Sequence, residues 1–222
     1  MDLMQQYDDY CERTDFTFWS EPLNAITNLS FLIAALILLR LTRDMGAGRG
    51  MARTLSWILF VLAFGSFAFH TFATGWAMLA DVLPIAAFVL VYAFAIGRDF
   101  MGLSVVKALL IVVAFIGFTV LSGPLFAAVP HIGGTAGYLP IPTFLLGLII
   151  WVGTRYPATA GALAVGLGMM VVSLIFRTID LPLCGAWPHG THFLWHTING
   201  IMLGWFIQTY RRHMLEGARA AL

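Results

Sequence analysis

The sequence predicts an all-α integral membrane protein, built as a bundle of seven transmembrane helices. Only 10% of its 222 residues are charged and 60% are hydrophobic, whereas a soluble domain typically carries about 25% charged residues. A helix needs roughly 20 mostly apolar residues to cross the hydrocarbon core, and apolar stretches of about that length follow one another along the chain. The connections between them are short, so a single membrane domain over residues 1–222 is expected.

The seven stretches expected to span the membrane follow an acidic N-terminal segment, residues 1–22. The fifth stretch starts at Pro140 and Pro142, near a helix start where proline is tolerated, and glycines in the sixth suit close helix packing. The bundle is expected over residues 23–212 and a cytoplasmic tail over 213–222. The predicted spans are 23–42, 54–72, 76–97, 103–122, 138–154, 159–177 and 192–211.

The basic residues predict the orientation of this bundle. With seven spans, the N-terminal side of the membrane holds only Arg13 and Arg177, against ten basic residues on the other side. Because Lys and Arg concentrate in cytoplasmic loops, the C-terminus is expected in the cytoplasm and the N-terminus outside or in an organelle lumen. The ten are Arg40, Arg43, Arg49, Arg53, Arg98, Lys107, Arg155, Arg211, Arg212 and Arg219.

The two cysteines, Cys11 and Cys184, both fall on the non-cytoplasmic side in this topology. An even number of cysteines on an oxidising side permits a disulfide, which would tie the N-terminal segment to the loop before the last span. Two free thiols that never meet are the alternative.

Few ionisable side chains lie within the predicted spans, where such residues usually face the bundle interior for a functional reason. Asp81 is the one acid well inside a span, and His70 ends the second span with Ser66 one turn earlier on the same face. His192 and His196 begin the seventh span four residues apart, so both imidazoles point the same way. These positions cluster toward the non-cytoplasmic ends of the second, third and seventh spans.

Three histidines from two helices fit a catalytic zinc site that keeps its fourth position for water. Neutral imidazole is a favoured zinc ligand, so His70, His192 and His196 are the predicted metal ligands. The alternative is that they hydrogen-bond between helices or lie at the membrane interface. The other histidines are expected outside the site, in loops or at the cytoplasmic end: His131, His189 and His213.

Asp81 and Ser66 are the candidate catalytic side chains. Asp81 would accept a proton from a zinc-bound water and pass it to a leaving group, or it would hydrogen-bond a histidine ligand in a chiefly structural role. Ser66 would donate a hydrogen bond to a developing oxyanion. Its alternative role is an ordinary hydrogen bond back to its own helix.

The N-terminal segment carries six acids. Oxygen ligands at short, irregular spacing suit calcium, although the spacing is not that of an EF-hand loop, and a solvated acidic tail is the preferred interpretation of these residues alone. Glu21 differs, because it precedes Pro22 at the start of the first span, where a carboxylate has a reason to be paired or coordinated. The six acids are Asp2, Asp8, Asp9, Glu12, Asp15 and Glu21.

Taken together, these residues resemble the alkaline ceramidase family, in a bacterial-type form, within the seven-span membrane hydrolases that include adiponectin-receptor-like proteins. Three pieces carry the resemblance in the right order: "DYCERTDFTFWSEPLNAITNLSFL", "GSFAFHTFATGWAMLADVLP" and "HFLWHTING". The resemblance implies a seven-helix fold, zinc held by His70, His192 and His196, and Ser66 and Asp81 in the family's serine and acid positions. It also implies hydrolysis of the ceramide amide to a sphingoid base and a fatty acid.

The resemblance further implies a disulfide between Cys11 and Cys184 and a calcium site in the N-terminal segment. This chain departs from the family at Thr14, where the family has asparagine, and at Val82, where it tends to have a second acid after Asp81. The catalytic acid is kept, so the chemistry is still expected. The calcium ligands would be Asp9, Glu12, Thr14 and Glu21 through side chains and Tyr10 through its carbonyl.

The function predicted from these features is zinc-dependent hydrolysis of a lipid amide within the membrane. Ceramide is the expected substrate, and another N-acyl lipid is the alternative. A receptor-like seven-helix protein with a non-catalytic metal is a further alternative, and a transporter is disfavoured because no repeat symmetry is visible. The expected partners are a lipid substrate and the membrane, without nucleic acid.

Overall fold

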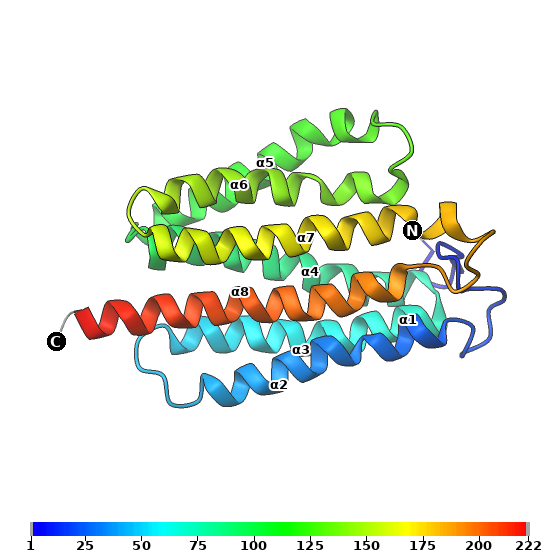
Figure 1. The fold of residues 1–222 in the computed structure, drawn as a ribbon, viewed down its shortest axis with the longest axis horizontal. Helices are drawn as coiled ribbons and strands as arrows, with labels where there is room; N and C mark the ends of the chain where they lie inside the picture. Colours follow the sequence, from blue (N-terminus) through cyan, green and yellow to red (C-terminus); the bar gives the residue numbers. More distant parts are fainter. Residues whose placement is uncertain (1, 221–222) are drawn as a thin grey trace.

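The computed structural model describes residues 2–220, and every regular element in that part of the chain is helical (Figure 1). The helices lie roughly parallel to the long axis of the molecule, and short connections join their ends. Two shorter helices, the π-helical η1 (Ile96–Phe100) and the 3₁₀ helix η2 (Gly133–Tyr138), extend α4 and precede α6. The α-helices are α1 (Pro22–Thr27), α2 (Leu29–Leu41), α3 (Arg49–Phe72), α4 (Gly75–Ala95), α5 (Val105–Ala127), α6 (Pro140–Gly153), α7 (Pro157–Leu183) and α8 (His192–Ala220).

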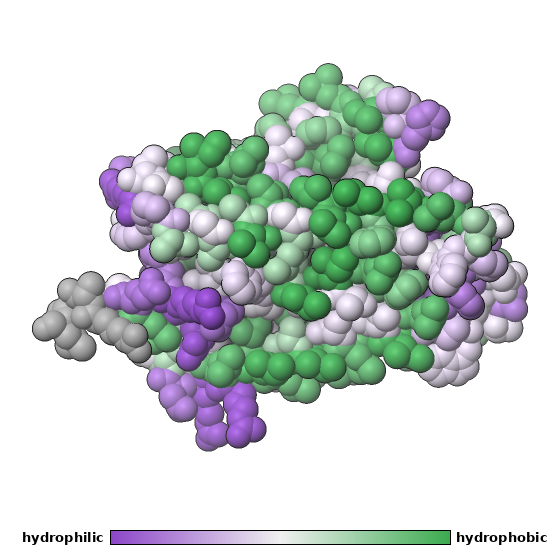
Figure 2. Space-filling view, in the orientation of Figure 1, coloured by the Kyte–Doolittle hydropathy of each residue, from purple (hydrophilic) through white to green (hydrophobic). Residues whose placement is uncertain are grey.

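Within the described residues 2–220, six helical segments are long and apolar enough to cross a membrane, as expected of a multi-pass membrane protein. α1 and α2 form one of them, because only Asn28 separates the two helices. Figure 2 shows the same property on the surface, where hydrophobic residues cover the middle of the molecule and hydrophilic ones gather toward both ends. α8 is not among the six, since polar residues such as His192, His196 and Asn199 lower its hydropathy.

The predicted spans correspond to these helices, and several helices extend beyond the predicted span boundaries. α7 continues to Leu183, six residues beyond the predicted end at 177, and so includes Asp180. α3 begins at Arg49 rather than at 54, and α5 continues to Ala127 rather than ending at 122. The tail predicted from residue 213 is a continuation of α8 as far as Ala220; residues 221–222 of that tail lie outside the described part of the chain.

The packing around α3 and α8 positions the polar residues of the bundle. α3 packs against α2 and α4, and α8 packs against α2 and α7. α3 and α4 approach so closely that a Cβ at Gly65 would collide with the carbonyl oxygen of Ala80. Residues Ser66 and Asp81 directly follow these two contact positions, so the close approach of the backbones brings their side chains to one place.

The N-terminal segment is fixed to the loop before α8 by a disulfide between Cys11 and Cys184, as predicted. The Asp180 carboxylate reinforces this connection by accepting a hydrogen bond from the Cys11 backbone N–H at 3.0 Å. On the other side, Gln6 forms a backbone bridge with Thr74, between α3 and α4. The segment therefore folds back over the end of the bundle where α1, α3 and α8 meet (Figure 1).

Replacing Cys11 with serine is expected to lower the stability of the folded protein by about 2–4 kcal/mol, because the long loop closed by the disulfide is released. Thermal unfolding in detergent micelles measures the change. Wild-type protein treated with a reductant serves as the control and should unfold at the same lowered temperature as the variant. Equal unfolding temperatures for the variant and oxidised wild type would contradict the prediction.

Candidate metal centre

Three histidines from two helices meet inside the bundle. His70 lies in the last turn of α3, and His192 and His196 occupy the first two turns of α8. Each residue is 1–2% exposed, and each offers one ligand atom within 4.8 Å of those of the other two. Within residues 2–220, this is the one group of at least three His, Cys, Asp or Glu side chains arranged to share an ion.

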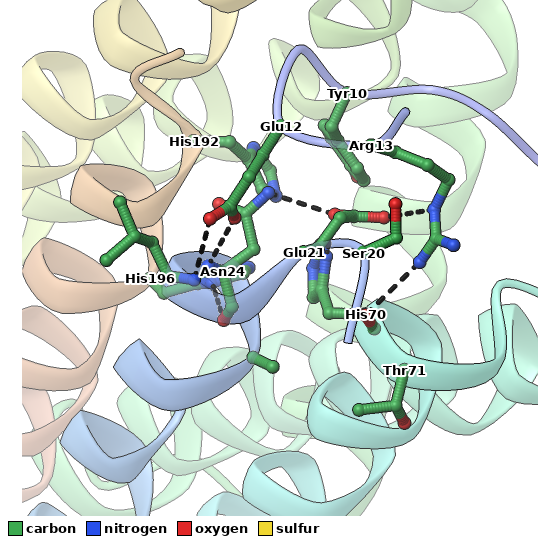
Figure 3. A network of polar contacts seen from close by, with 12 residues as sticks. Tyr10, Glu12, Arg13, Ser20, Glu21, Asn24, His70, Thr71, His192 and His196 are labelled. Atoms are coloured by element: carbon green, nitrogen blue, oxygen red, sulfur yellow. Dashed lines mark hydrogen bonds and ion pairs between the residues drawn. The ribbon is translucent and has the colours of Figure 1, made fainter. Parts of the chain in front are cut away.

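Two of the three imidazoles are oriented by neighbours that accept a hydrogen bond at Nδ1 (Figure 3). The Nδ1 atom of His70 lies 2.6 Å from a carboxylate oxygen of Glu21. The Nδ1 atom of His196 lies 3.0 Å from the backbone carbonyl oxygen of Asn24 in α1. When Nδ1 carries the proton, Nε2 has a free lone pair, which is the arrangement found in metal-binding histidines.

The histidine nitrogen atoms that make no hydrogen bond within the protein are the ones that could bind a metal ion. Among the described residues, the buried Nε2 of His70 and Nδ1 of His192 have no hydrogen-bond partner. Buried polar atoms are nearly always hydrogen-bonded, so each exception needs an explanation, and an ion held between two such atoms is one. Three buried imidazoles with converging nitrogen atoms therefore form a set that could bind a metal ion.

Glu21 is a buried carboxylate with three donors around it. Burial acts to raise the pKa of Glu21, but hydrogen bonds from His70 and Asn24 and the charge of Arg13 outweigh it, so the pKa lies below its usual value. The Asn24 side-chain amide donates to the same oxygen that faces His70, at 2.9 Å. Glu21 is therefore positioned to hold the His70 ring as a hydrogen-bonded carboxylate.

Asp180 fixes the start of α8 and with it the position of His192. One carboxylate oxygen of Asp180 accepts hydrogen bonds from the backbone N–H groups of Thr191 and His192, at 2.6 and 2.8 Å. A carboxylate in this place satisfies helix N–H groups that have no partner within the helix. The same side chain contacts the Cys11 backbone, so the disulfide-linked loop and the first histidine of α8 share one anchor.

Tyr10 covers the histidine group from the N-terminal segment. Its ring stacks on His192 with 3.8 Å between centroids and lies 5.1 Å from His70. The Tyr10 hydroxyl accepts a hydrogen bond from Arg177 at 3.1 Å. The Arg177 guanidinium also contacts the rings of Tyr138 and Trp195, at 4.9 and 5.4 Å from their centroids. Arg177 is thus accommodated within α7 by aromatic rings.

A mostly apolar cavity lies beside the histidines and holds both predicted catalytic side chains. Ser66, Asp81 and His196 line it, and the Ser66 side chain lies beside the Asp81 carboxylate. A second, almost wholly apolar cavity adjoins the first, since the two share five lining residues. The shared residues are Phe88, Val89, Ile141, Met170 and Leu203.

The residues predicted to bind calcium are placed differently from the histidines. The Glu12 carboxylate accepts hydrogen bonds from the backbone N–H groups of Leu23 and Asn24, at 2.7 and 2.8 Å, and so caps α1. The Tyr10 carbonyl accepts from the Arg13 backbone, and Thr14 is exposed. Asp9 lines a separate cavity with Arg177. The Glu21 oxygens face Arg13, Asn24 and His70.

The remaining histidines lie away from the metal centre. His131 and His189 are in exposed loops. His213 packs near the opposite end of α8, where its ring contacts Phe100 and Thr159.

Several residues of the centre were not predicted as such: Arg13, Asn24, Arg177 and Asp180. The sequence did indicate the two arginines, because Arg13 and Arg177 are the two basic residues predicted on the non-cytoplasmic side. Both lie beside the histidines.

Comparison of the chain with protein-family models and with curated proteins gives no match.

Proposed function

We propose that the chain is a zinc-dependent lipid amidase that cleaves an amide bond inside the membrane. The observation that carries the proposal is the buried group of His70, His192 and His196, which opens onto an apolar cavity holding Ser66 and Asp81. A site that only stabilised the fold would have little use for an acid and a hydroxyl beside the ion. A zinc ion held by three imidazoles supplies a Lewis acid that activates water and polarises an amide carbonyl.

The chain's own residues would carry the proton transfers. Asp81 accepts a proton from the attacking water and delivers it to the amide nitrogen as the C–N bond breaks, so that water and amide become carboxylic acid and amine. The Ser66 hydroxyl donates a hydrogen bond to the oxygen of the tetrahedral intermediate, a contribution of roughly 3 kcal/mol at comparable sites. Glu21 and the Asn24 carbonyl keep the His70 and His196 rings oriented throughout.

The two adjoining cavities favour a lipid as the substrate. Their lining is hydrophobic apart from the polar groups at the histidine end, so an acyl chain would lie between α4, α6, α7 and α8 with its amide next to Asp81. Small polar amides would gain nothing from such walls. Ceramide is the substrate proposed, from the resemblance of the motifs around Ser66, His70, Asp81 and His192.

We further propose that α8 is the seventh membrane span. It packs against α2 and α7 and runs beside the spans α3 and α7 (Figure 1), so its polar residues face the bundle interior rather than lipid. With the basic residues at the opposite end, the metal centre and the N-terminal segment then lie on the non-cytoplasmic side, and the end of α8 lies in the cytoplasm.

Removal of the metal is the direct test. Dialysis against a strong zinc chelator is expected to abolish hydrolysis of ceramide by the purified protein, and added zinc is expected to restore it. Release of fatty acid from labelled ceramide in mixed micelles gives the rate, and metal analysis of the same samples gives the zinc content. A zinc-loaded, folded protein that releases no fatty acid from ceramide or from other N-acyl lipids would refute the proposal.

A further inference from the structure

The guanidinium of Arg13 is a permanent positive charge at the metal centre. Its side chain is 1% exposed, and its three side-chain nitrogen atoms contact three different acceptors. Figure 3 shows the contacts with Glu21 and His70. Nε donates to a carboxylate oxygen of Glu21, Nη1 to the backbone carbonyl of Asp15 at 3.0 Å, and Nη2 to that of His70 at 3.2 Å. Arg13 therefore joins the N-terminal segment to the end of α3.

The positive charge of Arg13 faces the buried carboxylate of Glu21. The Glu21 side chain is 2% exposed, and an ionised carboxylate removed from water requires an opposite charge and hydrogen bonds. One Glu21 oxygen takes the Arg13 Nε–H, and the other takes His70 Nδ1 and the Asn24 amide. Arg13 therefore supplies the positive charge that faces the carboxylate next to the His70 ring.

Arg13 holds His70 at two points. Nη2 fixes the backbone carbonyl of His70, and Nε fixes the carboxylate that in turn fixes the His70 ring. The planar fork of a guanidinium can serve several acceptors in fixed directions, which a lysine ammonium on a flexible chain does less well. Partners of this kind around a ligand histidine commonly change metal affinity by 10–100-fold.

The same contacts engage the oxygen atoms that a divalent cation would need as ligands. Calcium takes six to eight oxygen ligands, most of them free carboxylates and carbonyls. Here Glu12 is engaged by the backbone of α1 and Glu21 by Arg13, Asn24 and His70, and the guanidinium already supplies positive charge at this place.

We propose that Arg13 is a positioning residue that replaces a bound cation: it holds Glu21, and through Glu21 the ligand His70, so that the zinc centre assembles without calcium. This inference rests on the zinc site proposed above. It requires that Arg13 acts on metal affinity, and that calcium has no effect on that affinity.

Zinc binding without substrate provides the test. Apo-protein in detergent is titrated with zinc in competition with a chromophoric chelator, for wild type, Arg13→Gln, Arg13→Lys and the control Arg43→Gln, an exposed arginine at the other end of the bundle. The expected loss of zinc affinity is about 10–100-fold for Arg13→Gln, smaller for Arg13→Lys, which keeps the charge, and none for Arg43→Gln.

Calcium gives the second arm of the same experiment. The zinc affinity of wild type is expected to be unchanged by a calcium-selective chelator and by added calcium. A wild-type affinity that falls when calcium is removed would overturn the proposal, and so would an Arg13→Gln variant with wild-type affinity. If Arg13→Gln does not fold, as judged by thermal unfolding of the apo-protein, Arg13→Lys decides the question alone. Since no amide is hydrolysed in these titrations, their outcome is independent of the proposed catalytic activity.

Discussion

Replacing His70 with alanine is expected to reduce zinc binding by more than about 100-fold, since a lost ligand costs more than a lost neighbour of a ligand, and to abolish ceramide hydrolysis. His70 is the one ligand contributed by α3, so its loss leaves two histidines on the same face of α8. Two ligands from one helix cannot close a three-histidine site around the ion. Zinc content of the purified variant and fatty acid release measure the two effects.

His189→Ala is the matched control for this experiment. His189 lies in the loop just before α8, is exposed, and is close in sequence to the ligands. This variant should keep the zinc content and the rate of wild type. Full hydrolysis by His70→Ala would refute the assignment of the metal centre, whereas equal loss in His189→Ala would point to a general effect on the fold.

Replacing Asp81 with asparagine is expected to lower the rate of hydrolysis by about 10²–10⁴-fold, the usual contribution of a positioned acid or base. Asparagine has nearly the same shape as aspartate but cannot accept the proton. Asp81 is not one of the three predicted ligands, so the zinc content should remain that of wild type. Rates and zinc content are measured on the same preparations.

The control for Asp81→Asn is the same substitution at an acid outside the metal centre. Asp44→Asn changes an exposed acid between α2 and α3 and should leave rate and zinc content unchanged. If Asp81→Asn loses zinc together with activity, the acid serves the ligands rather than the reaction. If its rate is that of wild type, the proposed proton transfer is wrong.

Most helices of the fold could be predicted from hydropathy, because burial in lipid leaves a local signal in the sequence; α8, with its polar residues, carries the weakest such signal. The boundaries were less accurate where polar residues lie inside a helix. The prediction ended the sixth span at Arg177, yet α7 continues through Asp180 to Leu183. Aromatic rings from three other elements surround Arg177, and backbone groups from two other segments bind Asp180. Contacts between distant segments leave no periodic pattern along the chain.

The three histidines could be predicted because residue type and helical spacing determine much of a metal site. The structure brings all three together and places Ser66 and Asp81 beside them. The residues that orient them were not predicted in those roles, since orientation depends on atoms that meet only after folding. Glu21 was expected to bind calcium, and the structure places it between Arg13 and His70. The calcium site is a prediction from the resemblance alone, and the proposal that Arg13 replaces the cation is its alternative.

The division of the three histidines between α3 and α8 has a consequence for how the protein is made. The His70 codon is translated early and the His196 codon near the end, so an ion held by these histidines could not meet all of them until the last helix has been inserted beside α2 and α7. Glu21, Cys11 and Cys184 must also be in place by then. Metal loading would therefore be a late step in biogenesis, and an ion that binds only the finished bundle would shift the balance between assembled and unassembled chains toward assembly.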